Sequence, residues 1–438
     1  FKQKTAYEML RSLVGSEMCI RDSCNFVNEM SSVKSAFFIF IMACTLSSYG
    51  QDPIRLKVMA YNILNYRNFP SYCPSSSNNP ILKEGYLNEI VNYVNPHLLV
   101  CNEINGYNSA AHNRILTHAL NINGENRWEK TDLFSNGSSL VNGIYFDQTF
   151  LGLKSQGNIS KDVNNQSLVR SIDICKFYYR DSLLAIDPDT IFFTVFSGHL
   201  KAGSSTSDIS DRDKATEAIM YYINSHAIGD NYFLAGDLNM KKSQEPGFQN
   251  LLNHPVSSIR FYDPENQPGN WNNNYAFRNL HSQSTRNGAT NNSCFAGGGL
   301  DDRFDHWLFN DDVVSGLSGI GYVSGSLTSV GNDGLHFNNS INSPTNNSVP
   351  SNILTALYEL SDHLPVTIEL DIERLQIGKK EYSGIPIITW TDHNGVSWVD
   401  VSQSAIGGKW FCTDTVSYTH LRAHETPEHL VCRLLLEK

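Results

Sequence analysis

Carboxylate, amide and imidazole side chains close several apolar runs of this chain. Asn62 ends the run LKVMAYN, Glu103 ends HLLVCNE, and His199 ends IFFTVFSGH. An imidazole can donate and accept protons near neutral pH, and carboxylates can bind hard cations. Each position alone is ordinary, because polar residues commonly cap turns at strand ends. Their joint order along the chain is what favours one shared catalytic site.

The same pattern continues further along the chain. Asp237 and Asn239 lie two residues apart in FLAGDLN and therefore point the same way in an extended strand. Asp305 opens another apolar run, and Asp362 and His363 stand directly before LPVTIEL. A polar group that closes a buried face is costly unless it is hydrogen-bonded.

The runs that carry these residues read as strands separated by helices. They are short, rich in β-branched and aromatic residues, and bounded by Gly, Pro, Asn and Asp. Helical spacing predicts helices over 81–95 and 210–226, the second with Ser210 as its N-cap. The regions 266–299 and 315–352 are longer than ordinary loops and are expected to be functional or mobile. The expected strands are 56–64, 97–104, 139–146, 172–179, 191–200, 231–239, 304–310 and 363–370.

Six motifs in this order resemble the endonuclease/exonuclease/phosphatase superfamily: MAYN, NPHLLVCNE, SGHLKAG, LAGDLN, RFDHW and SDHLPV. The resemblance covers about 55–371. It implies the deoxyribonuclease-I-like fold, an α/β (α+β) layered sandwich of two packed mixed β-sheets flanked by helices. It also implies a metal-dependent phosphoric ester hydrolase.

The resemblance implies a divalent cation held by Glu103, Asn62 and Asp362. Mg²⁺ suits this set, because it is a hard ion that takes oxygen ligands from one or two carboxylates and keeps several waters. Mn²⁺ and Ca²⁺ are alternatives.

The resemblance also implies catalytic roles. His199 and His363 would flank the scissile phosphate as general acid and base. Asp305 would orient His363 and stabilise its charged form. Asp237 would position or activate the attacking water, and Asn239 would donate to the phosphoryl oxygens.

Two arginines are candidate substrate contacts. Arg170, in LVRSIDICKF, matches the arginine that contacts substrate phosphate in nucleases of this superfamily. In YRNFPSY, Arg67 can meet phosphate and Tyr66 or Tyr72 a sugar, although a plain surface loop is the alternative.

The sequence departs from the family pattern at two positions. Asn102 replaces the usual Gln before the metal-binding Glu. The strand expected to supply an acid to the first catalytic histidine has Asn142 near that place and no acid, so His199 is expected to have a different partner.

The composition excludes several classes of protein and of binding partner. Hydrophobic residues make up 40% of the 438 residues, enough for a large core, which excludes wholesale disorder. The net charge of −11 argues against a polybasic protein that wraps nucleic acid. No apolar run is long enough to span a bilayer.

The ends of the chain are interpreted separately from the fold. Residues 30–51 have the charge, short apolar stretch and small residues of a secretory signal peptide. Residues 1–29 and 416–438 resemble translated sequencing-adaptor read-through and are interpreted as non-native. This leaves 52–372 as the catalytic domain and 373–415 as a short β-rich tail or truncated module.

Four cysteines fall within the expected catalytic domain. Cys101 and Cys175 lie inside apolar runs and are expected to be buried thiols. Cys73 and Cys294 lie in loops; in an exported protein they could pair, and free thiols are the alternative.

The leading hypothesis is a secreted, periplasmic or surface-exposed bacterial phosphodiesterase, monomeric, that acts as a nonspecific endonuclease on extracellular nucleic acid. The first alternative is a phosphatase or sphingomyelinase-type phosphoesterase of the same superfamily. The second is a catalytically silent binding module. The sequence leaves DNA, RNA, lipid and phosphomonoester substrates open.

Overall fold

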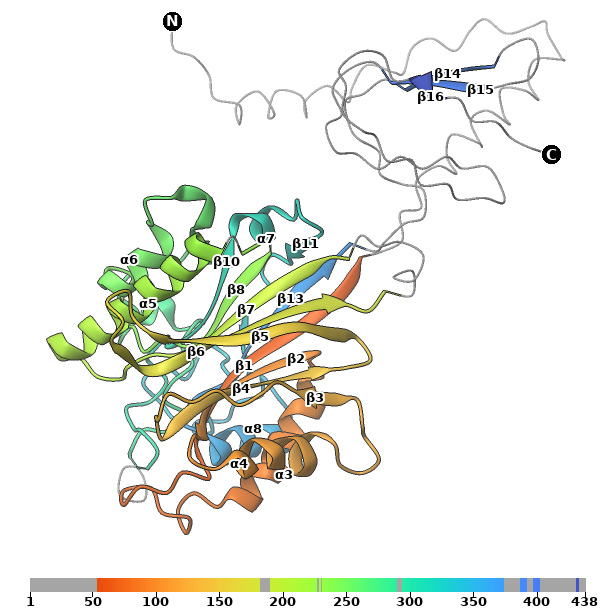
Figure 1. Cartoon of the computed structure of the whole chain (residues 1–438). Coiled ribbons are helices and arrows are strands. Elements are labelled where there is room, and N and C mark those ends of the chain that lie inside the picture. Colours follow the sequence, from red (N-terminus) through yellow and green to blue (C-terminus); the bar gives the residue numbers. More distant parts are fainter. Residues whose placement is uncertain are drawn as a thin grey trace, which may run out of the picture. The chain divides into compact units, whose positions relative to one another are not determined.

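The computed structural model describes residues 53–181, 190–226, 228–229, 231–289 and 294–373 (Figure 1). It also describes the backbone of three short strands, which pair as a small antiparallel sheet: β14 (Ile387–Thr391), β15 (Ser397–Val401) and β16 (Val431–Cys432). The expected leader 1–29 and signal peptide 30–51 lie outside the described residues. So do most of 373–415 and of 416–438, although β14 and β15 fall within the expected β-rich tail.

The first large sheet has seven strands. Its order is β11-β13-β1-β2-β4-β3, and β12 also pairs with β13. Only β1 and β2 run parallel, so the sheet is mixed. The strands are β1 (Ile54–Tyr66), β2 (Leu98–Asn105), β3 (Trp128–Lys130), β4 (Leu140–Asp147), β11 (Ile320–Tyr322), β12 (Thr328–Ser329) and β13 (Val366–Ile372).

The second large sheet has six strands in the order β5-β6-β7-β8-β10-β9. It is mixed as well, because β7 and β8 are parallel and the other pairs are antiparallel. The strands are β5 (Leu151–Lys161), β6 (Ser167–Tyr179), β7 (Phe192–His199), β8 (Tyr232–Asp237), β9 (Phe261–Tyr262) and β10 (Asp305–Asn310).

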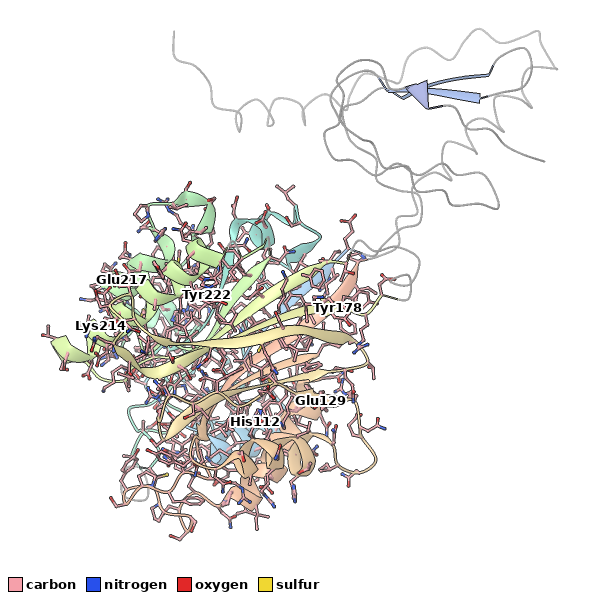
Figure 2. The ribbon with its side chains drawn as sticks, viewed as in Figure 1. His112, Glu129, Tyr178, Lys214, Glu217 and Tyr222 are labelled. Atoms are coloured by element: carbon pink, nitrogen blue, oxygen red, sulfur yellow. A yellow bond between two sulfur atoms is a disulfide. The ribbon has the colours of Figure 1, made fainter. Side chains whose placement is uncertain are left out.

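The two sheets pack face to face over a shared apolar core, with helices on their outer faces (Figure 1). The outer face of the first sheet is covered by α3 (Pro80–Val94), α4 (Ser109–Ile115), a π-helical turn (Leu116–Leu120) and α8 (Ser351–Leu360). The outer face of the second sheet is covered by α5 (Thr206–His226) and α6 (Pro246–Leu252). Figure 2 labels a residue in each outer layer, His112 of α4 and Tyr222 of α5. The short α7 (Asp311–Ser315) follows β10. The expected layered sandwich is therefore confirmed.

The local signals of the sequence explain where the two predicted helices form. Helix α3 begins at Pro80, where Asn79 accepts hydrogen bonds from the first backbone N–H groups, and it ends at Asn95 in a left-handed conformation. The prediction that Ser210 caps the second helix is wrong. That helix begins at Thr206, because Ser205 and Asp208 bond each other's backbone N–H in a capping box.

The four cysteines of the expected catalytic domain comprise two free thiols and one disulfide. Cys101 and Cys175 are buried free thiols, as predicted. Cys73 and Cys294 form a disulfide across 221 residues of sequence, so the paired alternative holds.

None of the helices in the described residues has the length and apolar character of a membrane span.

Trp307 connects the two sheets directly. It is fully buried on β10, and its indole N–H donates to the Val366 carbonyl of β13 at 3.0 Å. Trp307→Phe is expected to lower the free energy of unfolding by about 1–3 kcal/mol, because this buried carbonyl loses its donor. Equilibrium urea unfolding measures the change. Tyr275→Phe is the control at an exposed aromatic position, and an equal loss in both variants would contradict the assignment.

Candidate active site

The site is the polar end of the apolar core between the sheets. On β1, Leu56, Val58 and Ala60 face this core, and the strand's alternation brings Asn62 to the same face. The same alternation brings side chains from the second sheet to this end: His199 after Val195 on β7, Asp237 after Ala235 on β8, and Asp305 before Trp307 on β10. Period-two alternation alone therefore gathers four of the predicted residues.

Glu103 reaches the site against the alternation of its own strand. Leu99 and Cys101 face the outer helices, so a regular strand would turn Glu103 away from the inter-sheet core. The pairing of β2 with β4 shifts register between Cys101 and Ile104, and Glu103 adopts a left-handed φ of 67°. This bulge turns the carboxylate toward Asn62, at a cost of roughly 1–3 kcal/mol that surrounding contacts must offset.

Asn62 holds two carboxylates in place. Its side-chain Nδ2 donates to Glu103 Oε1 and to Asp237 Oδ2, each at 3.0 Å. Its Oδ1 accepts the Leu64 backbone N–H at 3.0 Å. This bond orients the side-chain amide so that its NH₂ group, not its oxygen, faces the carboxylates. Asn62 thus presents an N–H rather than an oxygen to this cluster, and its expected ligation of the cation stays a prediction.

His363 forms a hydrogen-bonded pair with Asp305. Its Nδ1 lies 2.7 Å from Asp305 Oδ2, which also accepts the Ser282 hydroxyl at 2.6 Å. Burial alone would lower the pKa of His363, but the charges of Asp305 and Asp237 raise it well above its usual value. The Ser361 hydroxyl accepts the His363 backbone N–H and so fixes the start of this segment. The predicted orientation of His363 by Asp305 agrees with this contact.

His199 has the opposite electrostatic character. Burial lowers its pKa well below the usual value, and the charges of Arg170 and His363 lower it further. Its Nε2 lies 3.6 Å from Asp237 Oδ2 and 3.7 Å from Glu103 Oε1. Burial raises the pKa of Asp237. The site therefore contains one imidazole that favours the charged form and one that favours the neutral form.

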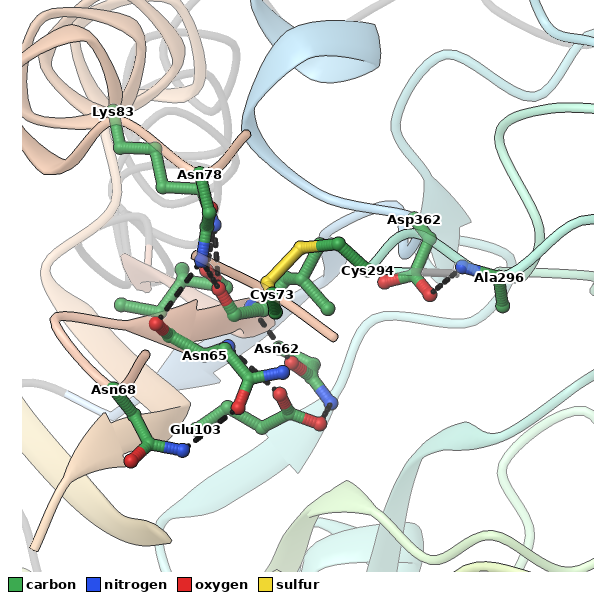
Figure 3. The surroundings of a disulfide bond; sticks show 12 residues. Asn62, Asn65, Asn68, Cys73, Asn78, Lys83, Glu103, Cys294, Ala296 and Asp362 are labelled. Atoms are coloured by element: carbon green, nitrogen blue, oxygen red, sulfur yellow. Dashed lines mark hydrogen bonds between the residues drawn. A yellow bond between two sulfur atoms is a disulfide. The ribbon is translucent and has the colours of Figure 1, made fainter. Parts of the chain in front are cut away.

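The donor set fits a hard divalent cation. Glu103, His199 and Asp237 each offer a ligand atom, and these atoms lie within 4.8 Å of one another. Burial raises the pKa of Asp362, and the charge of Glu103 raises it further, so these carboxylates repel each other. Asp362 Oδ2 accepts the Ala296 backbone N–H at 2.9 Å, while Oδ1 is buried without a hydrogen-bond partner (Figure 3). A cation would offset the repulsion, and oxygen ligands suit Mg²⁺.

Arg170 and Asn239 lie beside the histidines. Arg170 Nη1 donates to the Leu200 carbonyl at 2.8 Å, and Asn239 Nδ2 donates to the same carbonyl at 3.3 Å. Burial lowers the pKa of Arg170, while the charges of Glu103 and Asp237 raise it. The hydrogen bonds of Arg170 go to the carbonyls of His199 and Leu200, and no carboxylate of the described residues pairs with it, so its charge is available to a phosphate.

Arg67 is held by an acid. Its guanidinium donates to Glu84 Oε1 at 3.0 Å, and Arg114 donates to both oxygens of the same carboxylate. Tyr66 is fully buried and donates to Glu84 as well, so the suggestion that Tyr66 contacts a sugar is wrong. Tyr72 is about half exposed and remains available.

Two asparagines, Asn142 and Asn102, form a hydrogen-bonded chain that ends at the backbone N–H of Asp237. Asn142 Nδ2 donates to the carbonyls of β6 and β7, and its Oδ1 accepts Asn102 Nδ2 at 2.8 Å. Asn102 Oδ1 in turn accepts the Asp237 backbone N–H at 3.1 Å. His199 Nδ1 is buried without a hydrogen-bond partner, in keeping with the missing acid on β4.

Sequence reasoning missed two contributors. Gln283 lies in the long segment 266–299, where its side-chain amide is 2.7 Å from His363 Nε2 and 3.5 Å from Asp362 Oδ2. It follows no apolar strand, so the strand-end pattern could not have indicated it. Asp173 is a fully buried acid beside Asn142, and burial raises its pKa well above the usual value. Its signal was an acid on the apolar face of IDICKFYY.

No family model matches the sequence, and no curated protein matches it. Solved structures similar to the chain include the human Nocturnin catalytic domain with bound sulfate, at 11% identity and a TM-score of 0.44, covering 73% of this chain and 94% of that one. The D. rerio TDP2 complex with single-strand DNA product is 11% identical, with a TM-score of 0.45, covering 72% and 99%. An endonuclease/exonuclease/phosphatase from Bacteroides vulgatus is 10% identical, with a TM-score of 0.45, covering 73% and 100%. The last belongs to the superfamily that the sequence motifs resemble.

The Glu84 cluster has a pH-dependent contribution to stability. Burial would raise the pKa of Glu84, but Arg114, Tyr66 and Arg67 lower it to about 2. Because the folded-state pKa is lower than the unfolded value of 4.5, the Glu84 carboxylate stabilises the fold fully above pH 4.5. This stabilisation is lost as the pH falls toward 2. Glu84→Gln should therefore lower the urea midpoint most at pH 7, with a difference that shrinks below about pH 4. Glu217→Gln, an exposed acid on α5, is the control. A pH-independent difference would contradict the ion-pair explanation.

Proposed function

We propose that this chain is a divalent-metal-dependent phosphodiesterase that hydrolyses nucleic acid as a nonspecific endonuclease. One observation carries the proposal: two imidazoles of opposite electrostatic character converge on one carboxylate oxygen. His199 Nε2 lies 3.6 Å and His363 Nε2 lies 3.7 Å from Asp237 Oδ2. Titratable groups whose environments push their pKa values apart are suited to act as an acid and a base in one reaction.

The side chains divide the work of phosphoester hydrolysis. His363, held charged by Asp305, can donate a proton to a phosphoryl or leaving-group oxygen. His199, held neutral by burial, can accept one. Asp237 is fixed by Asn62 and by the Asn239 backbone N–H at 3.0 Å, so it can orient a water for attack on phosphorus. A divalent cation would be held by the carboxylates of Glu103 and Asp362, which leaves His199 free to accept the proton, and it would neutralise charge on the phosphate oxygens.

Substrate binding rests on local charge, because the chain as a whole is acidic. Arg170 Nη1 donates to the His199 carbonyl at 3.4 Å, and no ion pair joins its guanidinium to a carboxylate in the described part of the chain, so it is suited to a phosphate oxygen. Arg67 is proposed to assist, although Glu84 holds it. With a net charge of −11, binding to nucleic acid should be weak and sensitive to salt. The proposed setting is outside the cell or in the periplasm, with the chain acting as a monomer.

The two-histidine arrangement predicts the effect of His363→Ala. Hydrolysis of plasmid DNA, RNA and bis-p-nitrophenyl phosphate should fall by about 10²- to 10⁴-fold in kcat, because the proton donor is lost. Asp305→Asn should cause a smaller loss by releasing the ring. His226→Ala, an exposed histidine on α5, is the control and should keep full activity. Release of phosphate or phosphocholine without DNA nicking would favour the alternative phosphoesterase, and no hydrolysis at all would favour the silent binding module.

Metal removal gives an independent test of the same site. EDTA should abolish hydrolysis, and added Mg²⁺ or Mn²⁺ should restore it, because the carboxylate cluster repels phosphate unless a cation compensates. The measurement is plasmid nicking by the purified protein over a series of free metal concentrations. Activity that survives both EDTA and His363→Ala would overturn the mechanism.

A further inference from the structure

One disulfide joins the loop after β1 to a segment whose backbone orients Asp362, a carboxylate of the proposed cation site (Figure 3). Cys294 is two residues before Ala296, whose backbone N–H donates to Asp362 Oδ2 at 2.9 Å. Cys73 lies on the loop after β1, and its Cα is 4.4 Å from that of Cys294. The disulfide therefore ties the Asp362-binding segment to the end of β1.

The same disulfide supports the turn that orients Glu103. Cys73 and Cys294 pack with Leu64 and Phe295 in a small buried cluster of their own. Leu64 N–H donates to Asn62 Oδ1, and the next N–H along the chain, from Asn65, donates to Glu103 Oε2 at 2.8 Å (Figure 3). The backbone that fixes Asn62 and Glu103 is thus continuous with the disulfide cluster.

This turn has an unfavourable backbone conformation that needs outside support. Leu64 and Asn65 both have left-handed φ values, 47° and 46°. Their carbonyls are bonded from α3 and the loop before it. Lys83 Nζ donates to the carbonyls of Ile63 and Leu64 at 2.9 and 2.5 Å, and Asn78 Nδ2 donates to those of Leu64 and Asn65 at 3.2 and 3.1 Å. Lys83 is buried, so these bonds have no water to replace them.

We propose that the Cys73–Cys294 disulfide and Lys83 are positioning elements for the cation-binding carboxylates Glu103 and Asp362. They touch neither substrate nor reacting atoms. They hold the backbone N–H groups of Asn65 and Ala296 where those groups orient the carboxylates. This inference rests on the proposed cation dependence, and it assigns control of cation affinity to residues outside the catalytic set.

The test measures Mn²⁺ binding directly, by titration calorimetry or by the electron paramagnetic resonance signal of free Mn²⁺. Cys73→Ser/Cys294→Ser and Lys83→Met should each weaken Mn²⁺ binding by about 10-fold or more, the loss typical when partners of metal ligands are removed. Lys57→Met is the matched control, because Lys57 pairs with Glu369 near the opposite end of β1. Its Mn²⁺ affinity should be unchanged.

Reduction of the wild-type protein tests the disulfide without a substitution. Dithiothreitol supplies two electrons and two protons, so the disulfide becomes two thiols and the reagent a cyclic disulfide. Reduced wild type should bind Mn²⁺ like the double serine variant, and that variant should not respond to the reagent. This measurement, with Lys83→Met, keeps the test valid if the double variant fails to fold.

A second readout separates positioning from general stability. For the variants, the Mg²⁺ concentration that gives half activity should rise, while kcat at saturating Mg²⁺ stays close to wild type. Unchanged Mn²⁺ affinity in Lys83→Met and in reduced wild type would overturn the proposal, even if their unfolding midpoints fall. Absence of Mn²⁺ binding by wild type would overturn it too. Mn²⁺ binding that depends on the disulfide and Lys83, without any phosphoester hydrolysis, would refute the proposed function and leave this inference standing.

Discussion

The structure depends on the crowding of carboxylates at one buried end of the sandwich. Asp237, Asp305 and Asp362 are almost inaccessible to solvent, and Glu103 is only slightly exposed. Charges placed in such surroundings lose hydration and repel each other, so the group would be unstable without compensation. Each carboxylate accordingly meets a donor: Asn62 for two of them, the His363 ring for Asp305, and a backbone N–H for Asp362.

Burial among crowded charges also explains why the pKa values of the two histidines shift in opposite directions. His363 is placed among acids and therefore favours the charged form, whereas His199 is buried near Arg170 and favours the neutral form. Two copies of one side chain thus acquire different acid–base character from their surroundings alone. The arrangement also accounts for unfavourable backbone at Glu103 and in the turn at Leu64 and Asn65, since left-handed conformations cost free energy and persist where the surrounding structure enforces them.

The strand-end pattern identified most of the site because it reflects a physical rule. A strand that faces an apolar core along its length can place a polar residue on that face only where the core ends. Asn62, His199, Asp237 and Asp305 all follow this rule, and the structure brings them together. Gly236, in the run FLAGDLN, has a left-handed φ of 125°. Any other residue there would bring its Cβ against the Gly198 carbonyl, so the close approach of β7 and β8 requires glycine.

Apolar periodicity and turn residues are local properties, so they were enough to predict the layered α/β architecture, most strand positions and the types of side chain at the site. The remaining features depend on contacts between segments that lie far apart in the chain. Glu103 enters the site through a bulge that reverses its alternation, which depends on how β2 pairs with β4. Gln283 and the Cys73–Cys294 disulfide join segments that are distant in the chain and carry no periodic signal. The charge states of His199 and His363 follow from neighbours on other strands, so no local sequence pattern could distinguish the two.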